Sequence, residues 1–95
     1  MAYLCTVEFT VGIEAIERAE REHPEVIEAI GRAAEGLMKS HRRYIRDGRV
    51  LDIDEYESQE DYKAFVELAG ADIDRYGKLC GVQPVDTLYK LHSMI

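Results

Sequence analysis

Two pairs of oppositely charged side chains lie at matched distances on either side of Asp47-Gly48. This dipeptide favours a two-residue hairpin turn, because both central positions of a type I′ turn need a positive φ. Counting outward from the turn pairs Arg43 with Asp52 and His41 with Asp54 across two strands. A carboxylate beside an imidazole fixes its tautomer and raises its pKa, which suits a general base. A guanidinium on the same face can anchor an anionic or phenolic substrate.

Each pair also has a purely structural interpretation. His41 and Asp54 can form a cross-strand ion pair that serves register or solubility. Arg43 and Asp52 can form a salt bridge facing a partner subunit, and breaking it in a dry interface would cost about 3–5 kcal/mol. Glu8 of the first predicted strand is a further candidate, either as a proton acceptor or as an ion-pair partner of the arginines. The sequence leaves these alternatives open.

The same register predicts which side chains share a face of the sheet. One face carries the two charged pairs, and the other carries Tyr44, Leu51 and Ile53. We expect the apolar face of the hairpin to pack under helices. The charged face is expected to stay uncovered, with Glu8 beside it on the first strand.

The elements that must position these side chains follow from hydrophobic periodicity. Alternating patterns predict strands over residues 3–11 and 86–93, in addition to the hairpin strands of residues 41–56. On the first strand, Cys5, Val7 and Phe9 form the face that is expected to meet the helices.

Helical spacing fills the two long connections between the predicted strands. Residues 13–38 read as a helix in two pieces, because Pro24 suits the first turn of a new helix and breaks an existing one. Ser58 is placed to cap a second helical segment, which Gly81 ends. The order β-α-β-β-α-β predicts one α+β domain over residues 1–95, a ferredoxin-like split antiparallel sheet with both helical segments on one face.

Composition narrows the partners. Nineteen acidic residues against 12 Lys+Arg give a net charge of -7, which argues against nucleic acid and anionic membranes. A chain of 95 residues buries only about 60–65% of its unfolded surface, so a homodimer is expected. The start of the chain has no signal-peptide pattern, which predicts a cytoplasmic protein. Cys5 and Cys80 are expected to be buried, reduced thiols. The three histidines show no metal-ligand spacing, so neither a metal nor a cofactor is predicted.

One stretch also carries a family resemblance. It comprises Gly36-Leu37, His41, Asp47-Gly48, the run VLDIDEYES over residues 50–58, an aromatic helix through Phe65, and a closing Leu91-His92-Ser93. This stretch resembles the small dimeric α+β barrel proteins of the antibiotic-biosynthesis-monooxygenase-like group. Members include cofactor-free oxygenases of aromatic polyketides, haem-degrading enzymes and cyclases.

The resemblance implies that two sheets pack face to face across a dimer and that the uncovered face of each lines a central cavity. The chain departs from the family in having no Trp and no Asn. Tyr56 stands where many relatives have Trp, and the Asn/Trp/His set of the haem-degrading members is missing. A haem-degrading function is therefore not expected.

Three classes of function remain open at this point. In the first, a cofactor-independent monooxygenase-like enzyme acts on an aromatic or polyketide-type molecule, with His41 as base and Asp54 orienting it. Arg43, Asp52, Tyr56 and Glu8 would then bind the substrate. In the second, the protein binds a small ligand without catalysis, and in the third it is an accessory or structural dimer with a filled barrel. A cavity of at least about 300 Å³ that holds His41 separates the first two from the third.

Overall fold

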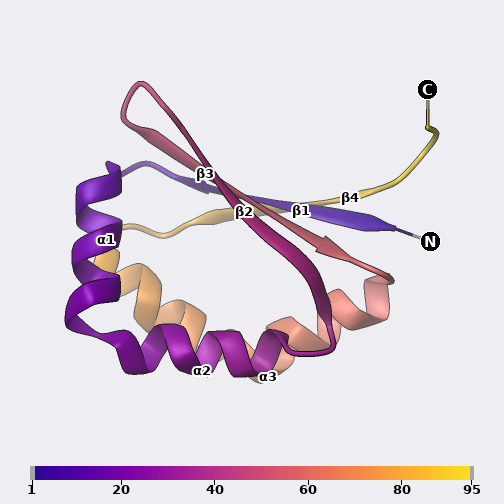
Figure 1. Ribbon diagram of the computed structural model, residues 1–95, viewed down its shortest axis with the longest axis horizontal. Helices are drawn as coiled ribbons and strands as arrows, with labels where there is room; N and C mark the ends of the chain where they lie inside the picture. Colours follow the sequence, from indigo (N-terminus) through magenta and orange to yellow (C-terminus); the bar gives the residue numbers. More distant parts are fainter. Residues whose placement is uncertain (1, 95) are drawn as a thin grey trace.

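The computed structural model describes residues 2–94, which form a four-stranded antiparallel sheet covered by helices on one face (Figure 1). The elements follow in the order β1 (Tyr3–Phe9), α1 (Ile13–Glu22), α2 (Pro24–Ala34), β2 (Met38–Arg46), β3 (Arg49–Tyr56), α3 (Gln59–Cys80) and β4 (Val85–Lys90). The strand order is β2-β3-β1-β4. Since α1 and α2 together make the first helical connection, the ferredoxin-like α+β fold predicted from the sequence is confirmed.

Local sequence explains where most of the helices begin and end. Pro24 is the first residue of α2, as its fixed φ and missing N–H allow. The side chain of Ser58 accepts a hydrogen bond of 3.1 Å from the backbone N–H of Asp61 and so caps α3. Gly81 ends α3 in the left-handed region with φ 78°.

The boundary between α2 and β2 differs from the prediction. The helical pattern predicts a helix that continues to Met38, but α2 ends at Ala34 and Met38 already begins β2. Gly36 adopts φ 75°, which interrupts the helix and turns the chain into the strand. The last strand also ends earlier than predicted, at Lys90.

The predicted hairpin register is confirmed, with Arg43 opposite Asp52 and His41 opposite Asp54. The predicted faces of the hairpin are wrong. β1 pairs with β3 so that Val7 lies opposite Asp52 and Cys5 opposite Asp54. Directly opposed residues share a face, so the charged pairs lie on the helix-covered face, together with the apolar side of β1.

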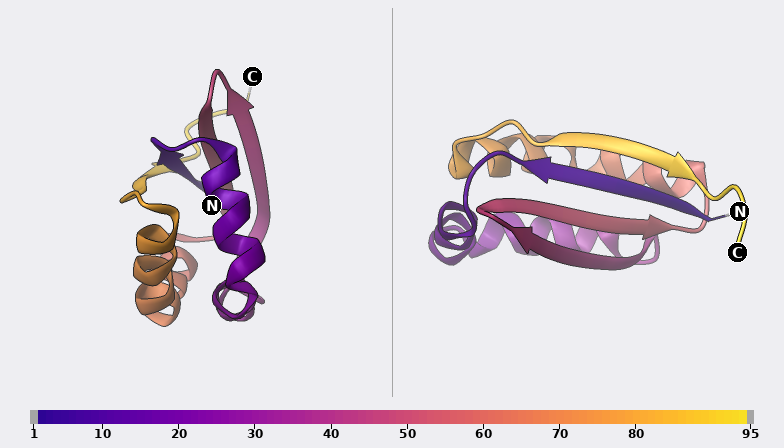
Figure 2. Two further views of the ribbon diagram at one scale, coloured as in Figure 1. Left: turned by 90° about the vertical axis from the view of Figure 1, so that its left-hand side faces the viewer. Right: turned by 90° about the horizontal axis from the view of Figure 1, so that it is seen from above.

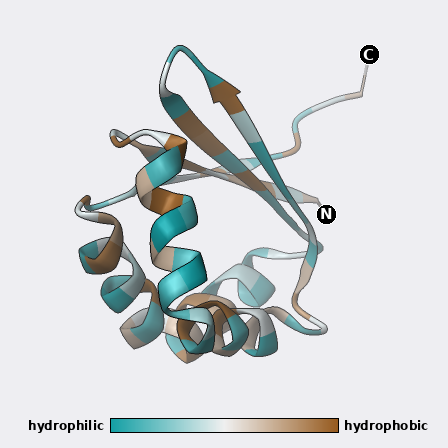
Figure 3. Cartoon of the chain, turned by 60° about the vertical axis from the view of Figure 1, so that its left-hand side comes forward, coloured by the Kyte–Doolittle hydropathy of each residue, from teal (hydrophilic) through white to brown (hydrophobic). Residues whose placement is uncertain are grey.

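The other face of the sheet has no helix over it within residues 2–94, as the two views in Figure 2 show. It carries the side chains that were expected under the helices: Tyr44, Leu51 and Ile53, joined by Leu4, Glu8, Val85 and Tyr89. Tyr44 is 49% exposed and Tyr89 55% exposed. We call this set of seven residues the bare face. Figure 3 shows hydrophobic and hydrophilic residues interleaved along the hairpin strands, as expected when successive side chains point to opposite faces of the sheet.

The core between sheet and helices has two parts. One gathers Phe9, Ile16, Val26, Val50 and Tyr76, and the other Cys5, Tyr56, Phe65 and Ala69. Val7 and Ile30 pack against both parts. None of the helices within residues 2–94 is long and apolar enough to cross a membrane.

Candidate functional site

A cavity of about 600 Å³ lies between the sheet and the helices. Its walls are largely apolar and include Val7, Ile27, Ile30 and Phe65. The resemblance implied a cavity between the uncovered faces of two sheets, whereas the cavity found here lies on the helix-covered face of a single chain. His41, Arg43, Asp52, Asp54 and Tyr56 nevertheless line one cavity together, because the whole charged side of the hairpin turned toward the helices.

His41 and Asp54 form the closest polar contact in this cavity. The Nδ1 atom of His41 lies 2.5 Å from Oδ1 of Asp54, and its Nε2 atom lies 3.8 Å from Oδ2 of Asp52. The hydrogen bond to Asp54 raises the pKa of His41 above its ordinary value. The side chain of His41 is 50% exposed and that of Asp54 only 10%, so the imidazole stands at the rim of the cavity with its carboxylate partner beneath it.

Arg43 is held by carboxylates on both edges of its guanidinium. Its Nε donates to Oδ1 of Asp52 at 2.8 Å and its Nη2 to Oδ2 at 3.0 Å. Nη1 and Nη2 also donate to the two carboxylate oxygens of Glu20, at 3.3 and 3.1 Å. These contacts, led by Asp52, raise the pKa of Arg43 further above its already high value. The guanidinium thus links β2, β3 and α1, and its positive charge is already paired with the carboxylates of Asp52 and Glu20.

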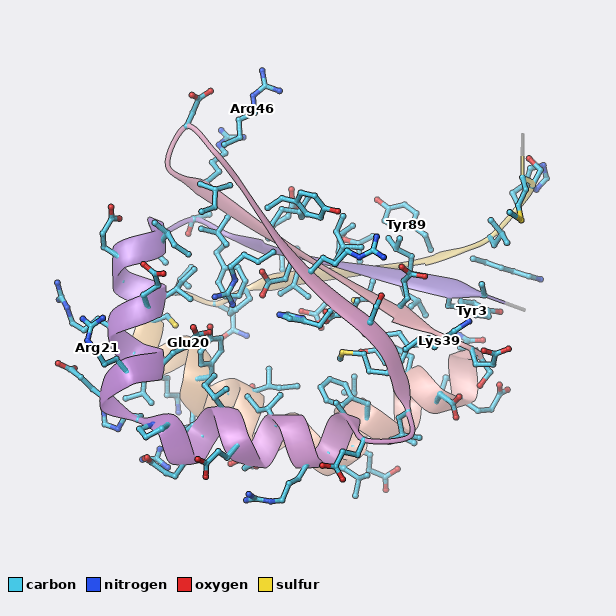
Figure 4. The ribbon with its side chains drawn as sticks, in the orientation of Figure 1. Tyr3, Glu20, Arg21, Lys39, Arg46 and Tyr89 are labelled. Carbon is cyan, nitrogen blue, oxygen red and sulfur yellow. The ribbon has the colours of Figure 1, made fainter. Side chains whose placement is uncertain are left out.

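Glu20 and Tyr76 complete the hydrogen-bond network around Arg43. Neither stood out in the sequence as a site residue. The hydroxyl of Tyr76 donates to Oε2 of Glu20 at 2.7 Å and accepts a 3.3 Å hydrogen bond from Arg43. Figure 4 shows Glu20 turned from α1 into the space under the sheet, whereas Arg21 points outward. The available signal was helical spacing, because Glu20 follows the buried Ile16 by four residues and so falls on the same face of α1.

Tyr56 forms a second polar point in the cavity wall. Its side chain is 1% exposed and packs edge-on against Tyr62, with ring centroids 5.4 Å apart, and against Phe65 at 6.1 Å. Burial, reinforced by the charge of Asp54, raises the pKa of Tyr56 well above its ordinary value. Among residues 2–94, its buried hydroxyl has no hydrogen-bond partner.

The cavity also receives Cys5 from β1 and Asp86 from β4. Burial raises the pKa of Cys5 to about 12, so its thiol stays protonated and inert at neutral pH. Burial and then the charge of Asp54 raise the pKa of Asp86. The sequence did not indicate Asp86 as a site residue, because its place in the cavity depends on the register of β4 against β1.

Glu8, a candidate from the sequence, and His92, the last histidine of the chain, lie elsewhere. Glu8 is exposed and opposes Leu51 and Val85, which places it on the bare face, away from His41 and Asp54. The prediction that Glu8 joins the charged pairs is therefore wrong. His92 follows the end of β4, is exposed, and does not line the cavity.

Comparisons with known proteins agree on the fold. No protein-family model matches the chain, and no curated protein matches it. Among solved structures, a dimeric ferredoxin-like protein from an uncultured marine organism shares 19% identity at a TM-score of 0.70, over 99% of this chain and 90% of the other. A monooxygenase from the gene ActVA-Orf6 of Streptomyces coelicolor, in complex with nanaomycin D, shares 16% identity at 0.68, over 99% and 90%.

A third structural neighbour is SnoaB, a cofactor-independent oxygenase from Streptomyces nogalater, with 7% identity at a TM-score of 0.63, over 99% of this chain and 94% of the other. The structural neighbours of the chain are thus antibiotic-biosynthesis-monooxygenase-like proteins and dimeric ferredoxin-like proteins, all at low sequence identity. The resemblance noted in the sequence is confirmed at the level of the dimeric α+β barrel fold.

Proposed function

We propose that the chain forms a homodimer through its bare face and that each subunit binds a small phenolic or polyketide-type molecule in the cavity under its sheet. There His41 acts as the base of a cofactor-independent oxygenation. The observation that carries the proposal is a cavity of about 600 Å³ with the His41–Asp54 pair in its wall.

The size and lining of the cavity favour a bound small molecule over a filled barrel. Small-molecule sites commonly enclose about 300–1,000 Å³ behind mostly apolar walls with a few polar groups. This cavity fits that description, with Ile27, Ile30 and Phe65 among its apolar residues and the hairpin supplying the polar ones.

The geometry of His41 suits the removal of a proton. When Nδ1–H donates to Asp54, Nε2 carries the lone pair and can accept a proton from a phenol or an activated C–H group. Asp54 then stabilises the imidazolium that forms. Because the same contact raises the pKa of His41, the fraction of active, neutral imidazole increases as the pH rises through that pKa.

The proposed oxidation uses dioxygen as its only oxidant. Deprotonation makes the substrate electron-rich, and its carbanion or phenolate passes electrons to O₂. A CH₂ group flanked by aromatic rings loses two hydrogens, gains one oxygen atom and becomes a carbonyl, while the second oxygen atom leaves as water. Two neighbours are described as a monooxygenase with a bound aromatic ligand and a cofactor-independent oxygenase, and these descriptions support the chemistry proposed here.

The homodimer is supported by the bare face. Exposed apolar side chains such as Tyr44, Val85 and Tyr89 gather on a sheet that has no cover of its own within the described residues. Exposed apolar side chains that gather on one face mark association sites. A neighbour of nearly the same length is described as a dimeric ferredoxin-like protein.

Oxygen uptake with dithranol, a tricyclic phenolic anthrone, tests the catalytic proposal. We expect the wild-type protein to accelerate formation of the anthraquinone, and His41→Ala to lower kcat by about 10²–10⁴-fold. His92→Ala, outside the cavity, is the matched control and should keep the wild-type rate. Binding of the anthraquinone product, measured by calorimetry, should survive in His41→Ala. If the product binds but no variant changes the rate of oxygen uptake, the protein is a ligand-binding dimer without this activity.

A further inference from the structure

The floor of the cavity has carboxylates on both sides of β1. Val7 lies opposite Asp52 on β3 and opposite Asp86 on β4, and Cys5 lies opposite Asp54. Neighbouring strands are about 4.8 Å apart, so Asp86 and the two β3 carboxylates flank β1 from strands about 10 Å apart. A group of ligand size above Val7 would meet negative charge from two directions.

The basic residues of the cavity do not offset this charge. Five carboxylates line it: Glu20, Asp52, Asp54, Asp74 and Asp86. Within the described lining, the basic side chains are His41 and Arg43, and the guanidinium of Arg43 is held by both Glu20 and Asp52. An anionic ligand would therefore enter a negative field without a free cation to pair with.

An independent feature points to a polar ligand group in the same place. The hydroxyl of Tyr56 is buried without a hydrogen-bond partner among residues 2–94, and an unmade buried hydrogen bond is costly. Tyr56 follows Asp54 by two residues on the same face of β3, so its ring lines the wall beside that carboxylate. Tyr62 and Phe65 add aromatic rings to this wall, and such rings attract cations within about 6 Å.

We propose that the cavity selects an aromatic ligand that carries a protonated amine, whose ammonium group lies over Val7 and Cys5 between Asp54 and Asp86, beside the Tyr56 hydroxyl. This inference rests on the proposed function, since it requires that the cavity binds a small aromatic molecule. Burial, and after it the charge of Asp54, raises the pKa of Asp86, and a cation between the two carboxylates would relieve both effects. The preference concerns the substituent of the ligand and not its ring system.

Three anthraquinones that differ in a single substituent test this selection. At the same ring carbon they carry an aminomethyl, a hydroxymethyl or a carboxylate group. Calorimetry at neutral pH and low salt compares a cation, a neutral group and an anion on one skeleton. We expect the amine to bind at least about tenfold tighter than the alcohol, which corresponds to about 1.4 kcal/mol, and the carboxylate to bind more weakly than the alcohol. The advantage of the amine should shrink as salt is added, since salt screens charge in an open site.

Asp86→Asn is the variant that isolates the charge. It keeps the shape of the side chain on an edge strand, so the fold should persist, and it leaves the His41–Asp54 pair in place. We expect it to reduce the preference for the amine over the alcohol at least about threefold, by the loss of one neighbouring charge. Asp72→Asn, an acidic residue of α3 that does not line the cavity, is the matched control and should keep the wild-type preference.

The possible results distinguish a failure of the ammonium proposal from a failure of the proposed binding function of the cavity. If the alcohol binds and the amine binds no tighter than the carboxylate, the inference is overturned and the proposed binding function stands. If Asp86→Asn and Asp72→Asn change the preference equally, the assignment of the ammonium position is overturned. If none of the three compounds binds, the proposed function of the cavity fails and the inference fails with it.

Discussion

The helix-covered face of the sheet carries Arg43, Asp52 and Asp54, whereas the bare face carries apolar side chains such as Leu51 and Tyr89. Stability of a lone subunit would favour the reverse arrangement. Buried ion pairs add little to stability because desolvation offsets their attraction, and exposed apolar residues promote association. The contrast fits the two proposed contacts, a ligand on the covered side and a second subunit on the bare side.

The covered face tolerates the charges of the hairpin because each of these charges is paired across β2 and β3. Asp52 is 4% exposed and Asp54 is 7% exposed, and each carboxylate accepts a hydrogen bond from a basic side chain of β2. The bare face has no comparable network within the described residues. Cutting one link should therefore have very different consequences on the covered face and at the exposed end of the same hairpin.

Arg43→Leu should give the largest effect. It leaves Asp52 and Glu20 facing each other beside Tyr76 without their shared cation, and loss of one member of a buried pair costs about 3–5 kcal/mol. Urea unfolding at neutral pH measures this loss. Arg46→Leu, on the same strand at the hairpin tip, is the control. Its side chain is 92% exposed, and surface ion pairs are worth about 0–1 kcal/mol. Equal losses in the two variants would remove the energetic distinction between the network and the surface.

The part of this network that lies in the hairpin was predictable from sequence, because turn chemistry fixes the pairing over a short stretch of chain. Asp47-Gly48 sets the register that brings His41 to Asp54, and the structure has the same register. The face could not be deduced in the same way. Which side of β3 meets the helices depends on its register against β1, more than forty residues away, and the usual rule that apolar side chains face inward led to the opposite assignment.

The remaining site residues come from elements that only the folded chain brings together. Glu20 lies on α1, Tyr76 on α3 and Asp86 on β4, and none of them stands in a recognisable motif with His41 or Arg43. Helical spacing puts Glu20 and Tyr76 on the same faces as buried residues of their helices, but it could not show that both reach one guanidinium. The proposed dimer would account for Leu51 and Ile53, which break the pattern expected of a lone sheet.

Ile53→Asp tests the bare face. The substitution replaces an apolar side chain of the proposed interface with a carboxylate that must lose its hydration there, between Thr6 of β1 and Arg42 of β2. It should weaken the dimer by about 2–4 kcal/mol, in the range of interface hot spots. Sedimentation velocity over a concentration series measures the change. Leu68→Asp is the control, because Leu68 is a 67% exposed leucine of α3 outside the bare face. A wild-type protein that sediments as a monomer at micromolar concentration would overturn the dimer, and equal effects of the two variants would place the interface elsewhere.

The pH dependence of stability tests the His41–Asp54 pair on the covered face, with a smaller expected effect. The pKa of His41 is raised in the folded protein by its hydrogen bond to Asp54, above an unfolded value of about 6.5. The stabilisation is therefore fully present below about pH 6.5 and is lost as the pH rises through the folded pKa. Urea midpoints should fall over that window in the wild type, by a modest amount because the imidazole is half exposed.

His41→Gln should flatten this fall, while His92→Gln should keep it because the His41–Asp54 pair is intact. A wild-type midpoint that rises over the same window would mean that the carboxylate does not hold the imidazolium. In that case Asp54 could not serve as the group that orients the base.

The smallest expected effect comes from Tyr56→Phe. The Tyr56 hydroxyl has no partner within the described residues, so its removal should change the free energy of unfolding by less than about 0.5 kcal/mol or stabilise the protein slightly. Tyr76→Phe is the matched variant. It removes a hydroxyl that contacts Glu20 and Arg43, and hydrogen bonds to charged groups contribute about 1.5–3 kcal/mol. Urea unfolding of both variants without ligand measures the difference.

If Tyr56→Phe costs as much as Tyr76→Phe, the Tyr56 hydroxyl is already satisfied within the protein and has no hydrogen bond left for a ligand. If it costs nothing and yet weakens binding of the aminomethyl anthraquinone, this tyrosine serves the ligand and not the fold.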